Sequence, residues 1–159
     1  MIRRVRIDYL PADPAVLRKI AGWLHAEFGP RARGATLVTR AQRIRERAGR
    51  RAIPLTFVAY ESGQPVGTAS LVMHDLYSRR DLKPWLASVY VSPPYRRRGF
   101  GAALCRRVLL ESRMLGFGRL YLFTFDQEKF YASMGWREVE RKHFWSQPIT
   151  IMVHTRSGF

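Results

Sequence analysis

The sequence has 159 residues, of which 47% are hydrophobic and 13% aromatic, a composition typical of one folded domain and not of a disordered chain. The formal net charge is +16, so the candidate partners are polyanions: nucleic acid, an acidic membrane surface or a phosphorylated small molecule. The basic residues are spread along the chain, a distribution that a solvated surface would also give.

Cysteine count and hydropathy exclude several classes of protein. The single cysteine, Cys105, cannot form an internal disulfide, and its place in a helical apolar pattern indicates a core residue. No spacing of histidine and cysteine indicates a metal site. No apolar run approaches the roughly 18 residues of a membrane span, and residues 1–7 lack the apolar core of a signal peptide. We therefore expect a cytoplasmic protein without a metal.

The first half of the chain combines strands with two helices. Asp13 is a suitable N-cap, with Pro14 at the first helical position. Ser62-Gly63-Gln64 has the composition of a hairpin turn. The predicted elements are a strand over 2–9, a helix from Pro14 to about Phe28, a basic loop over 31–36, an arginine-rich amphipathic helix over about 37–50, and strands over 53–61 and 65–76.

The second half predicts a strand–helix–strand unit followed by a hairpin. A strand followed by a helix and another strand usually places the two strands parallel, with a right-handed crossover. The elements are a strand over 85–92, a helix over about 100–116, a strand over 118–125, a short helix over about 127–134, and an antiparallel pair, 136–145 and 149–155, around Gln147-Pro148. The predicted fold class is α+β, with a mixed, mostly antiparallel sheet flanked by helices in a single domain, 1–159.

The stretch Arg96-Arg97-Arg98-Gly99-Phe100-Gly101 is the most informative in the chain. Two glycines between a strand and a helix allow a tight turn, and the amides at the helix start can hold phosphate oxygens. Three arginines add charge and bidentate donors. This pattern predicts a diphosphate cradle. A P-loop is excluded because no Gly-Lys-Ser/Thr follows, and a Rossmann fingerprint is excluded because Leu104 stands where its third glycine belongs.

Two segments resemble the GNAT superfamily of acetyl-CoA-dependent N-acetyltransferases. Residues 91–104 match its pattern Val-x-Pro-x-Tyr-Arg-x-x-Gly-x-Gly followed by a helix, and residues 130–136 match its Phe-Tyr-x-x-x-Gly-aromatic segment. The resemblance implies a sheet with a parallel strand pair splayed at the acetyl-CoA site and a bulge that directs the thioester toward the acceptor. Family members often carry an asparagine before the last helix; this chain has none, so that contact is either lost or replaced by Thr124 or Lys129.

The resemblance also assigns roles to individual residues. Acetyl-CoA is the implied co-substrate, and Tyr131 is the implied acid that protonates the departing thiolate. Glu27 and Asp75 are our first candidates for attracting the amine and removing its proton; His25, His74 and Ser88 are alternatives. The expected coenzyme-binding residues are Val89 and Val91 along the strand, Arg96, Arg97, Arg98, Gly99, Phe100, Gly101 and Ala102 at the turn, and Lys129.

The expected reaction is direct attack of a primary amine on acetyl-CoA in a ternary complex, on a small amine or a protein amine. Two other functions remain open at this point: a basic protein associated with nucleic acid, and a coenzyme-binding module without catalysis. Charge favours the nucleic-acid alternative, but no recognition helix or aromatic RNA motif supports it. We expect no membrane partner, and a homodimer is one of the possible oligomeric states.

Overall fold

The structure is a computed structural model that describes residues 5–29 and 36–156. The basic loop predicted over 31–36 and the start of the strand predicted over 2–9 lie largely outside the described residues. The elements in chain order are β1 (Val5–Tyr9), α1 (Pro14–Phe28), α2 (Leu37–Glu46), β2 (Leu55–Glu61), β3 (Gln64–Val72), the 3-10 turn η2 (Tyr77–Arg79), β4 (Trp85–Val91), the 3-10 turn η3 (Pro93–Tyr95), α3 (Phe100–Met114), β5 (Arg119–Thr124), α4 (Glu128–Ala132), β6 (Arg137–Phe144) and β7 (Gln147–Thr155).

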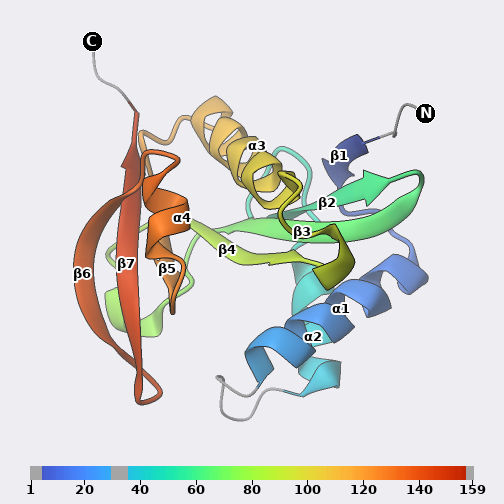
Figure 1. Ribbon diagram of the computed structural model, residues 1–159, viewed down its shortest axis with the longest axis horizontal. Coiled ribbons are helices and arrows are strands. Elements are labelled where there is room, and N and C mark those ends of the chain that lie inside the picture. The colour runs from blue at the N-terminus through green and yellow to red at the C-terminus, as the bar shows by residue number, and fades with distance from the viewer. Residues whose placement is uncertain (1–4, 30–35, 157–159) are drawn as a thin grey trace.

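The described strands form a seven-stranded sheet in the order β1-β2-β3-β4-β5-β7-β6. Neighbouring strands are antiparallel except β4 and β5, which are parallel and are connected through α3. In Figure 1, α3 lies on one face of the sheet, and α1 and α2 lie on the other. The predicted α+β class, with one parallel pair in a mostly antiparallel sheet, is confirmed.

Alternating side chains of the central strands fill both faces of the sheet. On β2, Phe57 packs with Leu104 and other residues of α3, whereas Val58 packs with Ile20 and Leu24 of α1. Every residue of β2 is buried. Because each large apolar side chain contributes about 1.5–3 kcal/mol when fully buried, this double layer holds α1 and α3 in fixed positions around β4.

The ends of two helices have clear local causes. The Asp13 carboxylate accepts a hydrogen bond from the Ala15 amide at 2.9 Å, which confirms the predicted N-cap of α1. The second helix ends at Glu46, earlier than predicted, because the chain turns back on itself at Gly49. There the amide donates to the Pro54 carbonyl at 3.0 Å, and a Cβ would lie 2.4 Å from the Ala52 oxygen.

The last hairpin turns two residues earlier than predicted. Trp145 and Ser146, with φ of 51° and 66°, form the turn, and β7 already begins at Gln147. Two consecutive positive φ angles are typical of the tight two-residue turns that match strand twist. Pro148 of β7 pairs with His143 of β6. The pairing of β7 with β5 stops at Thr150, so at Pro148 no hydrogen bond to β5 is lost by the missing amide proton.

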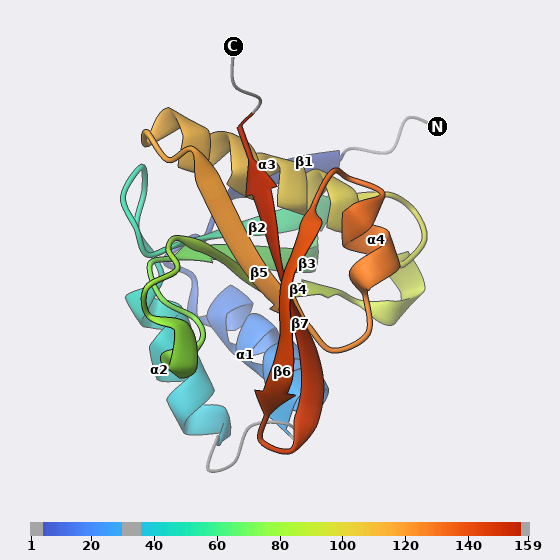
Figure 2. The same cartoon turned by 90° about the vertical axis from the view of Figure 1, so that its left-hand side faces the viewer.

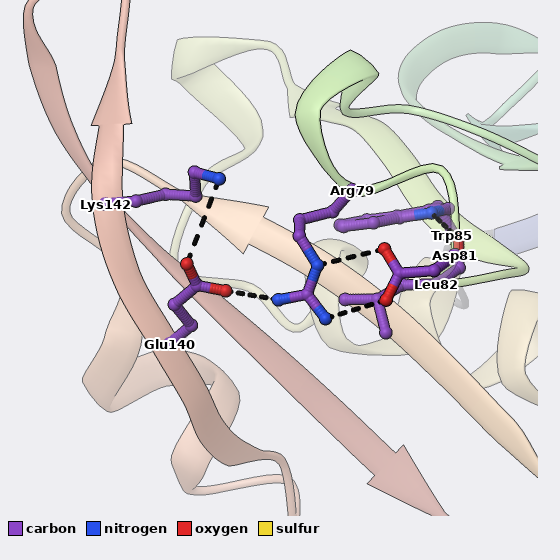
Figure 3. A network of polar contacts seen from close by, with 6 residues as sticks. All are labelled: Arg79, Asp81, Leu82, Trp85, Glu140 and Lys142. Atoms are coloured by element: carbon purple, nitrogen blue, oxygen red, sulfur yellow. Dashed lines mark hydrogen bonds and ion pairs between the residues drawn. The ribbon is translucent and has the colours of Figure 1, made fainter.

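The parallel pair is very short. Trp85 and Tyr121 are its one register pair, and beyond them β4 and β5 separate. Figure 2 shows β5, β7 and β6 together in front of the other strands. A polar bridge connects the two parts: Arg79 of η2 donates to Asp81 and to Glu140 of β6, and Lys142 lies 3.8 Å from Glu140 (Figure 3).

Candidate active site

A cleft of about 750 Å³ opens where β4 and β5 separate. Its walls come from α1, α2, the loop after β3, β4, the start of α3, β5 and the segment around α4. All the predicted site residues except Arg98 and Lys129 line this cleft. Residues that the sequence placed up to about a hundred positions apart therefore share one cavity.

The backbone of β4 bulges in the middle of the cleft wall. Ser70 of β3 is paired with Ala87, but Thr68 is paired with Tyr90, so β4 contains one residue more than its partner. Ser88 lies at the bulge and has a φ of 55°, a conformation that is uncommon for a residue with a side chain. The expected bulge is confirmed, and it turns Ser88 and Val89 toward the cleft that they line.

The turn before α3 exposes backbone amides to the same cleft. Gly99 is the N-cap of α3 with φ of 87°, in the left-handed region, and no side chain caps the helix. The first hydrogen bond within the helix runs from the Ala103 amide to the Gly99 carbonyl oxygen, at 3.0 Å. The amides of Phe100, Gly101 and Ala102 therefore lack intrahelical acceptors and lie at the positive end of the helix dipole. This is the geometry of an anion site.

The three arginines of the turn have different partners. Arg96 donates to the Val91 carbonyl at 2.8 Å and covers the ring of Tyr90. Arg97 lines the cleft with φ of 61°. Arg98 instead donates to Glu61 of β2 at 2.6 Å and lies outside the cleft lining. Arg96 and Arg97 are thus the turn arginines that border the cleft directly.

Tyr131 is buried at the floor of the cleft. Its ring packs against Phe130 and Trp136, with centroids 5.0 and 6.0 Å away. Burial raises the pKa of the Tyr131 phenol, so the hydroxyl keeps its proton at neutral pH. Cys105 is also buried, in the α3 core, where burial raises the pKa of its thiol to about 12. The predicted structural role of Cys105 is confirmed.

Two of the predicted carboxylates line the cleft. Glu27 lines it from the end of α1, and Asp75 from the loop after β3. Loss of hydration raises the pKa of Asp75, an effect that the charges of Arg47 and Arg43 oppose. Of the other base candidates, Ser88 lines the cleft, whereas His25 and His74 do not.

Three further arginines, in α2 and at its C-cap, are site residues that were not predicted from the sequence. Arg40, Arg43 and Arg47 line the cleft, and Arg47 Nη1 donates to the Ser88 Oγ at 2.9 Å. Their spacing of three and four residues was a usable signal, because it puts all three on one side of a helix. Lys129, by contrast, is exposed on α4, while Thr124 lines the cleft and its hydroxyl accepts from the Gln127 amide at 3.0 Å.

The described residues lack two further kinds of feature. Among residues 5–29 and 36–156, no group of three or more histidine, cysteine, aspartate or glutamate side chains is placed to hold a metal ion. In the same ranges, no helix combines the length and the apolar character needed to cross a membrane.

Comparisons with known proteins agree with this geometry. The family model described as "Acetyltransferase (GNAT) family" matches residues 18–136. No curated protein matches the sequence. Among solved structures, the chain is similar to yncA of Salmonella typhimurium with its cofactor acetyl-CoA: TM-score 0.73, 18% identity, 98% of this chain and 95% of that chain.

Two further solved structures share the fold. An aminoglycoside 6'-N-acetyltransferase complexed with coenzyme A gives a TM-score of 0.75 at 15% identity, over 94% of this chain and 96% of that one. The ribosomal-protein-S18-alanine N-acetyltransferase of Escherichia coli gives 0.68 at 20% identity, over 98% and 96%. The names of these three proteins point to different acceptors or to none. The likeness therefore concerns the fold and does not indicate an acceptor for this chain.

Proposed function

Because the chain belongs to the GNAT family of acetyltransferases, we propose that it transfers an acetyl group from acetyl-CoA to a primary amine, with both substrates bound at once in the cleft between β4 and β5. The observation that carries the proposal is that three structural features line the same cavity. The uncapped start of α3, the bulge of β4 and Tyr131 of α4 all border one cavity.

The residues at the start of α3 fit a diphosphate. The amides of Phe100, Gly101 and Ala102 would donate to its oxygens, and Arg96 and Arg97 would balance its charge. A Cβ on Gly101 would meet Phe130 only at 3.6 Å, an ordinary contact. The protein's own packing therefore does not require glycine there, and room for a ligand does.

The splayed edge of β4 would hold the pantetheine arm. Beyond Trp85 the strand has no register pair with β5, so the backbone near Val89 faces the cleft in place of a strand. An extended ligand can add to such an edge by hydrogen bonds to the main chain. Acetyl-CoA would supply the thioester carbonyl when bound, and an amide of the bulged segment would polarise it.

The acceptor must lose a proton before it can attack. A primary amine with a pKa of about 10.4 is only about 0.04% neutral at pH 7, which costs about 4–5 kcal/mol. Asp75 is suited to take this proton, directly or through water, because a raised pKa brings a carboxylate closer to the operating pH. Glu27 would attract the ammonium form from the side of α1.

Tyr131 would complete the transfer. As the new C–N bond forms and the C–S bond breaks, the electron pair of the C–S bond goes to sulfur, and the phenol donates its proton there. The buried phenol is protonated at neutral pH, and a proton from solvent would restore it after each transfer. The ring contacts with Phe130 and Trp136 fix the direction in which the hydroxyl points.

Calorimetric titration with acetyl-CoA and an assay of thiol release across a panel of amines test the proposal. Ala102→Glu places a carboxylate at the expected diphosphate and should weaken acetyl-CoA binding about tenfold or more. Ala103→Glu is the matched control, because Ala103 is the next residue and does not line the cleft. A folded wild-type protein that gives no heat with acetyl-CoA would refute the proposal.

A further inference from the structure

Two arginines of α2 and the arginine that caps its C-terminus form one cationic wall of the cleft. Arg40, Arg43 and Arg47 all line it. At 100° per residue, they fall within a sector of about 60° of the helix. We call these three side chains the arginine wall. Arg45, on the same helix, is exposed and points about 140–160° away from them.

The positive charge of the arginine wall is compensated only in part, by Asp75, whose charge acts on Arg43 and Arg47, and by Glu46 at Arg47. Within residues 5–29 and 36–156, none of its members has a carboxylate within ion-pair distance. The Nε of Arg40 is buried and makes no hydrogen bond with any described residue. Loss of hydration, followed by repulsion from Arg43, lowers the pKa of Arg40, and Arg47 is affected in the same direction. An anion bound here would relieve both effects.

The arginine wall lies away from the expected diphosphate. Helix α2 is on the sheet face opposite α3, whose start holds the uncapped amides (Figure 1). Arg47, which follows α2, donates to Ser88 at the bulge in the middle of β4 and not at the turn after Val91. The phosphates of the coenzyme and the arginine wall therefore occupy different parts of the cleft.

We propose that the acceptor of this enzyme is a zwitterionic amine, whose oxyanion, a carboxylate or a phosphate, is bound by Arg40 and Arg43 while its amine is presented at the bulge of β4. This inference rests on the proposed acetyl transfer and names its substrate class. Arginine donates two parallel hydrogen bonds to planar or tetrahedral oxyanions, which suits it to both groups. Glu27 and Asp75 line the same cleft and complement the ammonium end.

A matched acceptor series tests the assignment at constant ionic strength. Butylamine, 4-aminobutanoate and 3-aminopropyl phosphate share a primary amine on a short chain and differ in the other end. For wild-type protein, kcat/KM should be about tenfold or more higher for an anionic member than for butylamine, the ratio expected from one charge-assisted hydrogen bond. Whichever anionic member is preferred identifies the oxyanion.

Variants of α2 separate recognition from catalysis. Arg40→Gln should reduce kcat/KM for the preferred anionic amine about tenfold, while butylamine changes less than about twofold. Arg43→Gln also removes a charge that acts on Asp75, so its expected effect is an about tenfold loss in the ratio of kcat/KM between the anionic amine and butylamine. Arg45→Gln, on the far side of the helix, should change neither. A thermal-shift series on the coenzyme A complex provides a second readout: the anionic amine should raise the Tm of wild type and not that of Arg43→Gln.

The possible failures are distinguishable. If acetyl-CoA is turned over with butylamine as well as with the anionic amines, or if Arg43→Gln slows all acceptors equally, the zwitterionic acceptor is refuted and the acetyl transfer stands. If no anionic amine shifts the Tm of the coenzyme A complex or is acetylated, the assignment is likewise refuted. If acetyl-CoA itself does not bind, the proposed function fails, and the acceptor assignment fails with it.

Discussion

Gly67 provides the sharpest test of how β4 is positioned. It lies on β3 opposite Val91. A Cβ at this position would stand 2.9 Å from the Tyr90 carbonyl oxygen and 3.1 Å from a methyl group of Leu104. Because the nearer atom belongs to the backbone of the paired strand, no side-chain rotation relieves the contact. Gly67→Ala must displace the strand that carries the bulge.

Overpacking of this kind costs about 1–3 kcal/mol. At about 2–4 °C per kcal/mol for a chain of this size, the Tm should fall by about 2–12 °C. Acetyl-CoA should also bind more weakly, because Tyr90 and Val91 line the cleft. Urea denaturation gives the free energy of unfolding, and calorimetry gives the Kd.

Gly22→Ala is the matched control, because it adds the same methyl group and is expected to raise the free energy of unfolding where Gly67→Ala lowers it. Gly22 is exposed inside α1, and a Cβ there meets nothing within 4 Å. The alanine should stabilise the protein by about 0.5–1 kcal/mol through helix propensity. Equal unfolding free energies for Gly67→Ala and wild type would show that β3, β4 and α3 are less tightly packed than described here.

Three further predictions concern titratable side chains. Tyr131→Phe keeps the ring contacts and should lower kcat about a hundredfold or more without changing the Kd of acetyl-CoA, as stopped-flow and calorimetry can measure; unchanged kcat would exclude the acid role. Burial, and after it the charge of Arg113, lowers the pKa of His154 in the folded protein. As the pH falls below about 6.5, this histidine therefore takes up a proton in the unfolded state before it does so in the folded state. The wild type should therefore lose stability between pH 7 and 5 more steeply than His154→Gln, and parallel stability profiles would contradict this. Cys105, with a thiol pKa of about 12, should resist iodoacetamide at pH 8 until the protein is unfolded, and mass spectrometry would detect rapid labelling of the native state if the burial is wrong.

The sequence predicted those features that depend on short-range patterns. Apolar runs and the crossover rule were enough for the parallel pair of β4 and β5, and Asp13 before Pro14 was enough for the start of α1. The glycines at 99 and 101 indicated the anion site because a turn there needs a left-handed residue and free amides. Each of these signals lies within a few residues of the feature that it predicts.

Other features depend on contacts between distant segments, which no local pattern carries. The helix predicted to reach residue 50 ends at Glu46 because Gly49 meets Pro54. Ser88 has no intrinsic preference for positive φ, and it adopts this conformation because β4 has one residue more than β3 across the bulge. The arginines in and just after α2 had the spacing of one face, but only the packing of α2 against α1, on the sheet face opposite α3, shows that this face borders the cleft.

The single register pair between β4 and β5 has a mechanical consequence. Seven strands form a continuous sheet, yet its two halves are joined by main-chain bonds only around Trp85 and Tyr121, so that point is a natural pivot. Arg79 spans the same boundary farther out, from η2 to Glu140 of β6, and acts as a latch on one side of the pivot. Ions in solution screen such a partly exposed latch, so the stiffness of the cleft should depend on ionic strength even where the core does not.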